Sequence, residues 1–191
     1  MIRSIRMCIN HSSKIRTLDL DNPRLQFEPG YNVLIGPNGA GKSTTLDAIA
    51  SCPMCKADKA GPDGGIKYIT TETLNPLSGG SFATREKMVQ AIRSMFRSHG
   101  QGVLDSLGNQ YQASEIAVLI DSPETGQDHE RCVLIHEGLL KMSRHVQVII
   151  ATNSLIFMRG GNLIDLGNKT LPRLIKATEK LVAGFDSTVS K

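Results

Sequence analysis

The sequence has few aromatic residues and no long apolar run. It contains no Trp, three Tyr and five Phe among 191 residues, which disfavours a platform that stacks the bases of single-stranded nucleic acid. No stretch approaches the roughly 18 consecutive apolar residues that a membrane helix needs. The start, Met-Ile-Arg-Ser-Ile-Arg, lacks the uninterrupted apolar segment of a signal peptide. We therefore expect a chain that neither spans a membrane nor is exported, and we expect it in the cytoplasm.

The sequence also has few cysteines and a small net charge. Four cysteines in a chain of this size do not make a disulfide framework. The net charge of +4 is too small to require a nucleic-acid partner, and it does not exclude DNA. With 40% hydrophobic and 21% charged residues, the composition is that of an ordinary globular protein. The length favours a single domain over residues 1–191.

Short apolar runs alternate with helical stretches, which is typical of a three-layer α/β domain. Residues 1–9 and 15–28 alternate apolar and polar side chains and predict half-buried antiparallel strands. Denser apolar runs predict buried parallel strands at 31–35, 116–120 and 146–150. Helices are expected from near Gly41 and over 82–97, 101–110, 127–143 and 171–182. Segment 51–65 is rich in Gly and Pro and is expected to be a loop.

A phosphate-binding loop follows the apolar run 31–35. Residues 36–44 read Gly-Pro-Asn-Gly-Ala-Gly-Lys-Ser-Thr, which fits the pattern Gly-x4-Gly-Lys-Ser/Thr between a strand and a helix. The glycines let backbone amides point at phosphate oxygens, and the helix presents its positive end to the same anion. Lys42 adds a charge near the β and γ phosphates, and the Ser43 hydroxyl is placed to ligate Mg²⁺. Nucleotide contacts are expected from Gly36, Asn38, Gly39, Ala40, Gly41, Lys42, Ser43 and Thr44.

The second half of such a site is an acidic residue at the end of a neighbouring buried strand. Residues 117–121, Ala-Val-Leu-Ile-Asp, supply one. The carboxylate of Asp121 emerges where the strand ends, so that it can hold Mg²⁺ through a water shell together with Ser43. We therefore expect ATP and Mg²⁺ as the ligands of this site.

The phosphate loop and the segment 121–128, Asp-Ser-Pro-Glu-Thr-Gly-Gln-Asp, resemble those of the ABC-type ATPases. The likeness extends from Ile2 to about Leu166 and is greatest to the soluble branch of SMC, RecF and related small ATP-binding proteins. It implies a P-loop NTPase fold of ABC type, mainly a parallel sheet with an N-terminal antiparallel β portion. It also implies a strand at 66–72 and a reduced helical lobe over about 66–110. Beyond the likeness, the charged residues spread over about 168–191 indicate a C-terminal surface helix and tail.

The resemblance further implies a homodimer that forms on ATP binding. ABC-type ATPases complete each site with a Leu-Ser-Gly-Gly-Gln-like turn from the second subunit. Segment 97–101, Arg-Ser-His-Gly-Gln, lies close enough before Asp121 to leave room for one helix and one loop. The residues assigned to this turn are Ser98, Gly100 and Gln101. Leu77-Ser78-Gly79-Gly80 matches the letters better but lies too far from Asp121, and we interpret it as a loop.

Two catalytic side chains of the family are replaced. The general base that follows the strand-end Asp is Ser122 here, and the γ-phosphate His after the next strand is Asn153. Serine has no useful basicity at pH 7, and loss of a positioned base lowers a rate by about 10²–10⁴. Glu124 is a candidate to act in its place through a water. We therefore expect a dimer that binds ATP and hydrolyses it slowly, used in DNA maintenance or in defence against mobile elements.

The alternative is a module that does not hydrolyse ATP and whose ATP-dependent dimerisation recruits a protein partner such as a nuclease. Ser122 and Asn153 favour this alternative, whereas the intact Lys42, Ser43 and Asp121 permit either activity. Measured release of phosphate separates the two.

Cys52-Pro-Met-Cys55 has the spacing and the proline of half a zinc knuckle. Two further ligands would have to come from a second chain or from Cys8, which is distant in sequence. The other interpretation is a pair of ordinary reduced thiols, and the sequence leaves both open.

Overall fold

The structure is a computed structural model that describes residues 1–15, 17–18, 23–59, 65–70 and 115–189. The helices expected at 82–97 and 101–110, the segment 77–80 and the turn with Ser98, Gly100 and Gln101 lie outside these residues. They therefore stay predictions.

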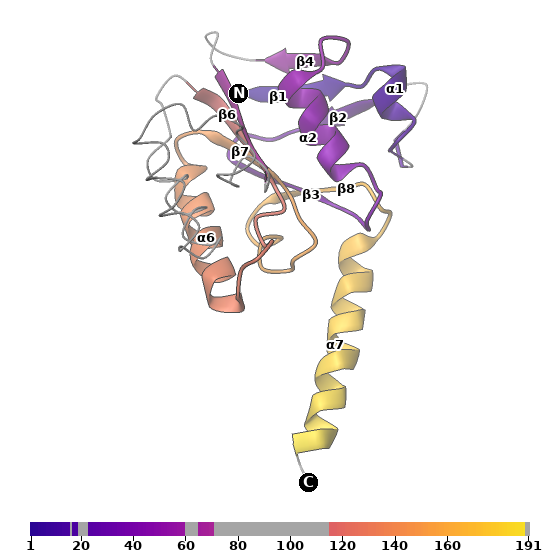
Figure 1. Cartoon of the computed structure of the whole chain (residues 1–191), viewed down its shortest axis with the longest axis vertical. Coiled ribbons are helices and arrows are strands. Elements are labelled where there is room, and N and C mark those ends of the chain that lie inside the picture. The colour runs from indigo at the N-terminus through magenta and orange to yellow at the C-terminus, as the bar shows by residue number, and fades with distance from the viewer. Residues whose placement is uncertain (16, 19–22, 60–64, 71–114, 190–191) are drawn as a thin grey trace, which may run out of the picture.

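A parallel five-stranded sheet forms the centre of the fold, with the strand order β5-β6-β7-β3-β8 (Figure 1). Its strands are β3 (Tyr31–Ile35), β5 (Gly65–Ile69), β6 (Glu115–Asp121), β7 (Gln147–Ala151) and β8 (Asn162–Asp165). Every residue of β3 and β7 is buried, because both faces of the sheet are covered. The sequence predicted β3, β6 and β7 to within one residue at each end, but it did not indicate β8.

The expected N-terminal antiparallel portion is a second sheet, with the order β2-β1-β4. It consists of β1 (Ile2–Arg6), β2 (Arg24–Gln26) and β4 (Lys56–Lys59). Both neighbours pair with β1 in antiparallel register. The N-terminal antiparallel β portion that the resemblance implies is therefore confirmed.

Three local predictions in this region are wrong. The strand expected over 1–9 ends at Arg6, and helix α1 (Ile9–Ser12) follows, with Cys8 in extended conformation at its N-cap. Of the described residues in 15–28, only Arg24–Gln26 form a strand, and Leu18 N–H donates to Ile15 O and not to a neighbouring strand. The loop expected over 51–65 contains β4, whose residues pair with β1 although they are mostly exposed.

Helices α2 (Lys42–Ser51) and α6 (His129–Met142) cover opposite faces of the central sheet (Figure 1). Alternate residues of β6 show why: Ala117 and Leu119 belong to the core that includes α2, and Val118 and Ile120 to the core that includes α6. Because side chains alternate across a strand, one apolar run fills both cores. The three-layer α/β fold expected from the sequence is confirmed.

The buried side chain of Gln147 links the two sheets. Its Oε1 accepts a hydrogen bond from Ile2 N–H at 2.6 Å, and its Nε2 donates to Ile2 O at 2.8 Å and to Glu28 O at 3.0 Å. A buried amide without partners would cost free energy, so this pairing fixes where β1 lies against β7. The sequence predicted a buried strand over 146–150, but no pattern in it indicates the hydrogen bonds that Gln147 makes to Ile2.

Helix α7 (Thr170–Val189) extends away from both sheets (Figure 1), and it is longer than the predicted 171–182. Its start is held by Asp165, whose carboxylate accepts from Thr170 N–H at 2.6 Å, Thr170 Oγ1 at 2.6 Å and Gly167 N–H at 2.8 Å. Burial raises the pKa of Asp165, but these hydrogen bonds and Arg173 outweigh it and lower the pKa. None of the helices in the described part of the chain has the length and apolar character needed to cross a bilayer.

Candidate functional site

Three neighbouring strands end at one edge of the central sheet, where polar residues gather. Strand β7 lies between β6 and β3, and Ala151 at its end pairs with Asp121 on one side and Leu34 on the other. The carboxyl ends of parallel strands meet at the same edge of a sheet, where such folds bind ligands. The chain therefore brings the phosphate loop, the acidic segment after β6 and Asn153 after β7 to one place.

The phosphate loop has the conformation that its glycines allow. Gly39 and Gly41 have φ angles of 78° and 94°, in the left-handed region. A Cβ at Gly41 would also lie 2.6 Å from Ile15 Cγ1, so the segment after α1 packs directly behind the loop. A Cβ at Gly39 would meet nothing within 4 Å, because this glycine borders open space. The loop is thus tightly backed on one side and open on the other.

The Lys42 ammonium lies inside the loop. Its Nζ donates to Gly36 O at 2.7 Å and to Pro37 O at 3.2 Å, and the side chain is only 8% exposed. Burial lowers the pKa of Lys42, while the carboxylates of Glu124 and Asp121 act in the opposite direction. A bound metal ion would neutralise these two carboxylates. The buried Lys42 ammonium is then suited to bind an anion such as phosphate.

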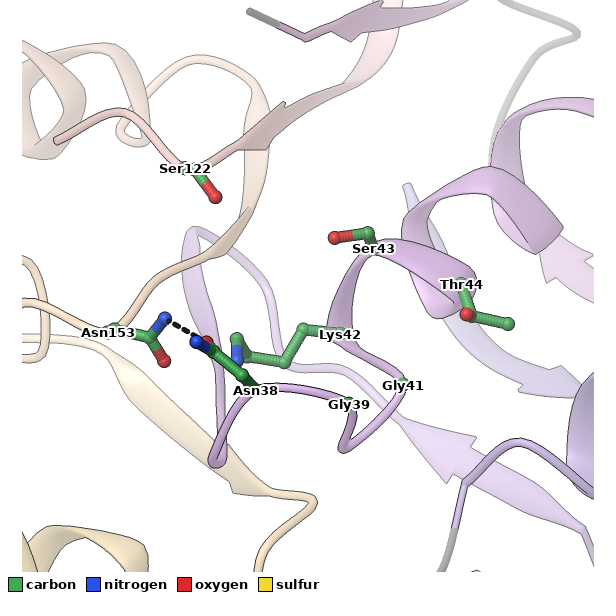
Figure 2. Close-up of a pocket in the computed structure, with 8 residues that line it drawn as sticks. All are labelled: Asn38, Gly39, Gly41, Lys42, Ser43, Thr44, Ser122 and Asn153. Atoms are coloured by element: carbon green, nitrogen blue, oxygen red, sulfur yellow. Dashed lines mark hydrogen bonds between the residues drawn. The ribbon is translucent and has the colours of Figure 1, made fainter. Parts of the chain in front are cut away.

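A pocket of about 290 Å³ opens in front of the loop (Figure 2). Ser122 and Asn153 approach it from the side opposite Ser43 and Thr44. Its lining residues are Asn38, Gly39, Gly41, Lys42, Ser43, Thr44, Ser122 and Asn153. Eight residues that sequence reasoning singled out therefore surround one space. Gly36 and Ala40 shape the loop without lining this pocket.

Asp121 and Ser122 form a strained turn at the end of β6. Ser122 has a φ of 52°, which is unusual for a residue with a side chain. Its N–H donates to Ala151 O at 2.9 Å, and its hydroxyl donates to Asp121 Oδ1 at 3.1 Å. The turn presents the Ser122 hydroxyl to the pocket and leaves Asp121 with further acceptor positions for a metal-bound water.

A chain of hydrogen bonds connects Glu124 to the phosphate loop. Glu124 Oε2 accepts from Thr152 Oγ1 at 2.8 Å, and its Oε1 accepts from Asn153 N–H at 2.9 Å. Asn153 Nδ2 in turn donates to Asn38 Oδ1 at 3.0 Å. The structure therefore places Glu124 and Asn153 in contact with each other and next to Lys42. Sequence reasoning missed Thr152, although a polar residue directly after a buried strand is a signal for such a role.

The turn after β8 also supports the loop, although no sequence pattern indicates it. A Cβ on Gly167 would collide with Pro37 Cδ and would lie 2.5 Å from Thr170 Oγ1 and 3.1 Å from Gly36 Cα. Only a residue without a side chain lets this turn lie against the phosphate loop.

Replacing Gly167 with Ala is expected to weaken nucleotide binding by roughly 10-fold, since a shift of Gly36 and Pro37 removes the acceptors that hold Lys42. Isothermal titration with ATP measures this effect. The matched control is Gly138→Ala in α6, where a Cβ meets nothing within 4 Å and is expected to stabilise the helix by about 0.5–1 kcal/mol. Equal ATP affinity in both variants would show that the turn after β8 does not position the loop.

The polar groups around the pocket are of the kinds that bind a nucleoside triphosphate together with Mg²⁺. Helix α2 has no acidic residue in its first turn, and no side chain among the described residues caps it, so its N-terminal amides are available to an anion. The Ser43 hydroxyl and the Asp121 carboxylate are hard oxygen ligands of the kind that Mg²⁺ prefers. These are the residues that would hold the phosphates and the metal ion.

The chain matches the AAA domain family over residues 12–178. Among solved structures, the SMC head domain from Thermotoga maritima superimposes with a TM-score of 0.53 at 11% identity, over 86% of this chain and 94% of that one. A dimeric post-hydrolysis state of the ATP-binding cassette MJ0796, bound to ADP and Pi, gives a TM-score of 0.51 at 17% identity, over 87% and 91% of the two chains. Both likenesses concern the fold.

A shorter likeness is to the DNA replication and repair protein RecF of Aliivibrio fischeri (strain MJ11), at 46% identity over 44 residues. The match spans 23% of this chain and 11% of that relative. The family match, in contrast, covers most of the sequence and includes the phosphate loop at 36–44. The chain therefore belongs to the AAA domain family, and its fold is the P-loop fold of ABC cassettes and SMC heads.

Proposed function

We propose that this chain binds ATP with Mg²⁺ in the pocket before the phosphate loop, dimerises on it and hydrolyses it slowly. The observation that carries the proposal is the convergence of Lys42, Ser43, Ser122 and Asn153 on one pocket at the carboxyl edge of the sheet. Backbone amides of the loop and Lys42 hold the β and γ phosphates. Ser43 and Asp121 hold Mg²⁺, which neutralises charge on the phosphate oxygens.

Slow hydrolysis follows from the residues around the γ-phosphate position. Ser122 offers a hydroxyl where the family has a carboxylate, so it cannot take a proton from water at neutral pH. Glu124 is the nearest substitute, because its two oxygens face Thr152 and Asn153 and each keeps a free lone pair. Glu124 is therefore the proton acceptor for the attacking water, at a lower rate than a base placed at position 122.

Dimerisation is supported by the residues that would sense the γ-phosphate. Asn153 donates to Asn38 of the phosphate loop, and both side chains line the pocket, so a bound nucleotide meets both of them. Ser98, Gly100 and Gln101 of one subunit are assigned to the ATP of the other. Two of the similar solved structures are described as dimeric cassettes.

A role in DNA maintenance or in defence against mobile elements is supported by a row of cations on the antiparallel sheet. Arg24, Arg6 and Lys56 lie directly opposite one another across β2, β1 and β4, and all three are exposed. Like charges opposite each other destabilise a sheet, and DNA phosphates would offset them. The RecF relative carries DNA replication and repair in its name.

The second candidate function is a module that binds ATP and dimerises without hydrolysing it, and whose dimer recruits a protein partner. The observation that favours it is the engagement of both Glu124 oxygens by Thr152 and Asn153, which gives this carboxylate a structural task.

The function is tested by mixing the purified chain with ATP and Mg²⁺ and following scattered mass and released phosphate together. The expected result is twice the monomer mass, with turnover of about 10⁻³–10⁻¹ s⁻¹. A stable dimer without phosphate release supports the second candidate. Binding of ATP without any change in mass contradicts the dimer, and absence of ATP binding contradicts both candidates.

The same preparation tests the DNA proposal with a short fluorescent duplex at increasing salt. Binding is expected to weaken as salt rises and to weaken further in Arg6→Glu, because both changes act on phosphate contacts. Binding that Arg6→Glu leaves unchanged would contradict a contact at this row.

A further inference from the structure

Four side chains with metal-binding atoms converge at the end of α2, away from the nucleotide pocket. The sulfur atoms of Cys8, Cys52 and Cys55 and a ring nitrogen of His11 all lie within 4.8 Å of one another. His11 Nδ1 is 3.1 Å from Cys8 Sγ and 3.4 Å from Cys55 Sγ. All three cysteines are free thiols, so no disulfide competes for them.

Pairing of β1 with β4 brings these residues together. In this antiparallel ladder Arg6 lies opposite Lys56, so Cys8 and Cys55 come off the same end of the two strands. Cys52 is the C-cap of α2, whose last turn leads into β4. Cys8 is the N-cap of α1, and the turn of this helix brings His11 back beside it. The cluster is thus assembled from two segments with the same spacing, Cys8-x-x-His11 and Cys52-x-x-Cys55.

We propose that Cys8, His11, Cys52 and Cys55 bind one structural zinc ion within a single chain. Three thiolates and an imidazole make one of the usual closed ligand sets for tetrahedral zinc. In such a site two sulfur ligands stand about 3.8 Å apart and a sulfur and a nitrogen about 3.5 Å apart, given Zn–S near 2.3 Å and Zn–N near 2.0 Å. The two distances to His11 Nδ1 are shorter by at most a few tenths of an ångström, a gap that small side-chain rotations cover.

The groups around the four side chains also favour the binding of a metal ion. Cys8 N–H donates to Cys55 Sγ at 3.3 Å, a contact that orients the ligand and stabilises a thiolate. Cys8, His11 and Cys52 are half-buried and Cys55 is buried, so an ion has a path from solvent to the cluster. Three thiolates and a neutral imidazole around Zn²⁺ carry a net charge of −1. This negative charge would lie beside the opposed cations Arg24, Arg6 and Lys56 and would reduce their mutual repulsion.

The ion would hold the segment that backs the phosphate loop. From His11 the chain runs to Ile15, which packs against Gly41 at the start of α2, while Cys52 lies at the other end of the same helix. Zinc would therefore fix α1, β4 and the far end of α2 to one another. Its role is to stabilise this part of the fold, and it stands independently of ATP hydrolysis.

The test begins with the metal content of the purified chain, which is expected to be about one zinc ion per chain. Replacing zinc with Co²⁺ is expected to give the intense visible absorption of a tetrahedral site and a thiolate charge-transfer band. Removal of the metal with a chelator is expected to lower the melting temperature by at least about 5 °C. Absence of zinc together with an octahedral Co²⁺ spectrum overturns the proposal.

Variants assign the ligands. Cys55→Ser is expected to lose zinc, whereas Cys132→Ser, which changes a buried cysteine of α6 outside the cluster, is expected to keep it. His11→Ala is expected to weaken the affinity for Zn²⁺ by at least about 10-fold, and His11→Cys to restore it, since a four-cysteine set also binds zinc. Since His11 is half-buried, its variants keep the assignment testable if Cys55→Ser does not fold. Equal zinc content in Cys55→Ser and Cys132→Ser, or equal affinity for Zn²⁺ in His11→Ala and the parent chain, contradicts the assignment.

Discussion

Replacing Glu124 with Gln is expected to lower the rate of ATP hydrolysis by about 10²-fold or more while ATP affinity stays within about threefold. The amide cannot accept a proton from the attacking water. It keeps the shape of the site, because Oε1 still accepts from Asn153 N–H and the Thr152 hydroxyl can turn to accept from the new NH₂ group. Single-turnover release of phosphate measures the rate, and titration of the same variant measures the affinity.

Ser122→Ala is the matched control for that experiment. Ser122 lines the pocket and donates to Asp121, but its hydroxyl is no base, so a rate within about threefold of the parent is expected. If Ser122→Ala loses as much activity as Glu124→Gln, the two residues act through the shape of the turn. If Glu124→Gln hydrolyses ATP at the parental rate, Glu124 is not the proton acceptor.

Local sequence patterns predicted those parts of the fold in which the local sequence determines the conformation. The apolar runs of β3, β6 and β7 are dense enough to require burial on both faces. The glycines of the phosphate loop adopt left-handed φ angles that other residues avoid. These two signals alone place the loop, Asp121 and Asn153 at one edge of the sheet, which is most of the candidate site.

Features that depend on distant partners escaped the same reasoning. The residues of β4 read Lys-Ala-Asp-Lys and carry no apolar alternation, and they become a strand only by pairing with β1. Gly167 and Gln147 matter through contacts with Pro37 and Ile2, which no local pattern reveals. The position of such residues is a property of the assembled fold.

The cysteine and histidine cluster shows how one wrong local prediction hides another feature. The strand predicted over 1–9 ends before His11, so it offered no reason to place His11 beside Cys8. Helix α1 instead turns His11 to the side of Cys8, as residues three apart do in a helix. The half knuckle at Cys52 and Cys55 thereby gains its two other ligands within the same chain.

Replacing Lys42 with Met is expected to weaken ATP affinity by about 10–100-fold, because it removes a charge-assisted hydrogen bond to phosphate, whose free energy corresponds to a change of that size. The folded state is expected to tolerate the change, because losing a buried charge offsets leaving Gly36 O and Pro37 O without a donor. Melting temperatures within a few degrees of the parent, measured without ATP, check this balance. Lys141→Met, the same change at an exposed position of α6, is the control and should bind ATP like the parent.

The pH dependence of ATP affinity gives a second readout for Lys42. Burial lowers the pKa of this ammonium, with Glu124 and Asp121 opposing the shift. The charged form binds phosphate, so the affinity of the parent is expected to fall as pH rises, beginning below the pH at which an exposed lysine titrates. Lys42→Met removes the titrating group, and its weaker affinity should show no such fall. An alkaline fall of the same size in Lys42→Met would assign the titration to another group, and a parent affinity that is constant with pH would mean that Lys42 keeps its proton throughout.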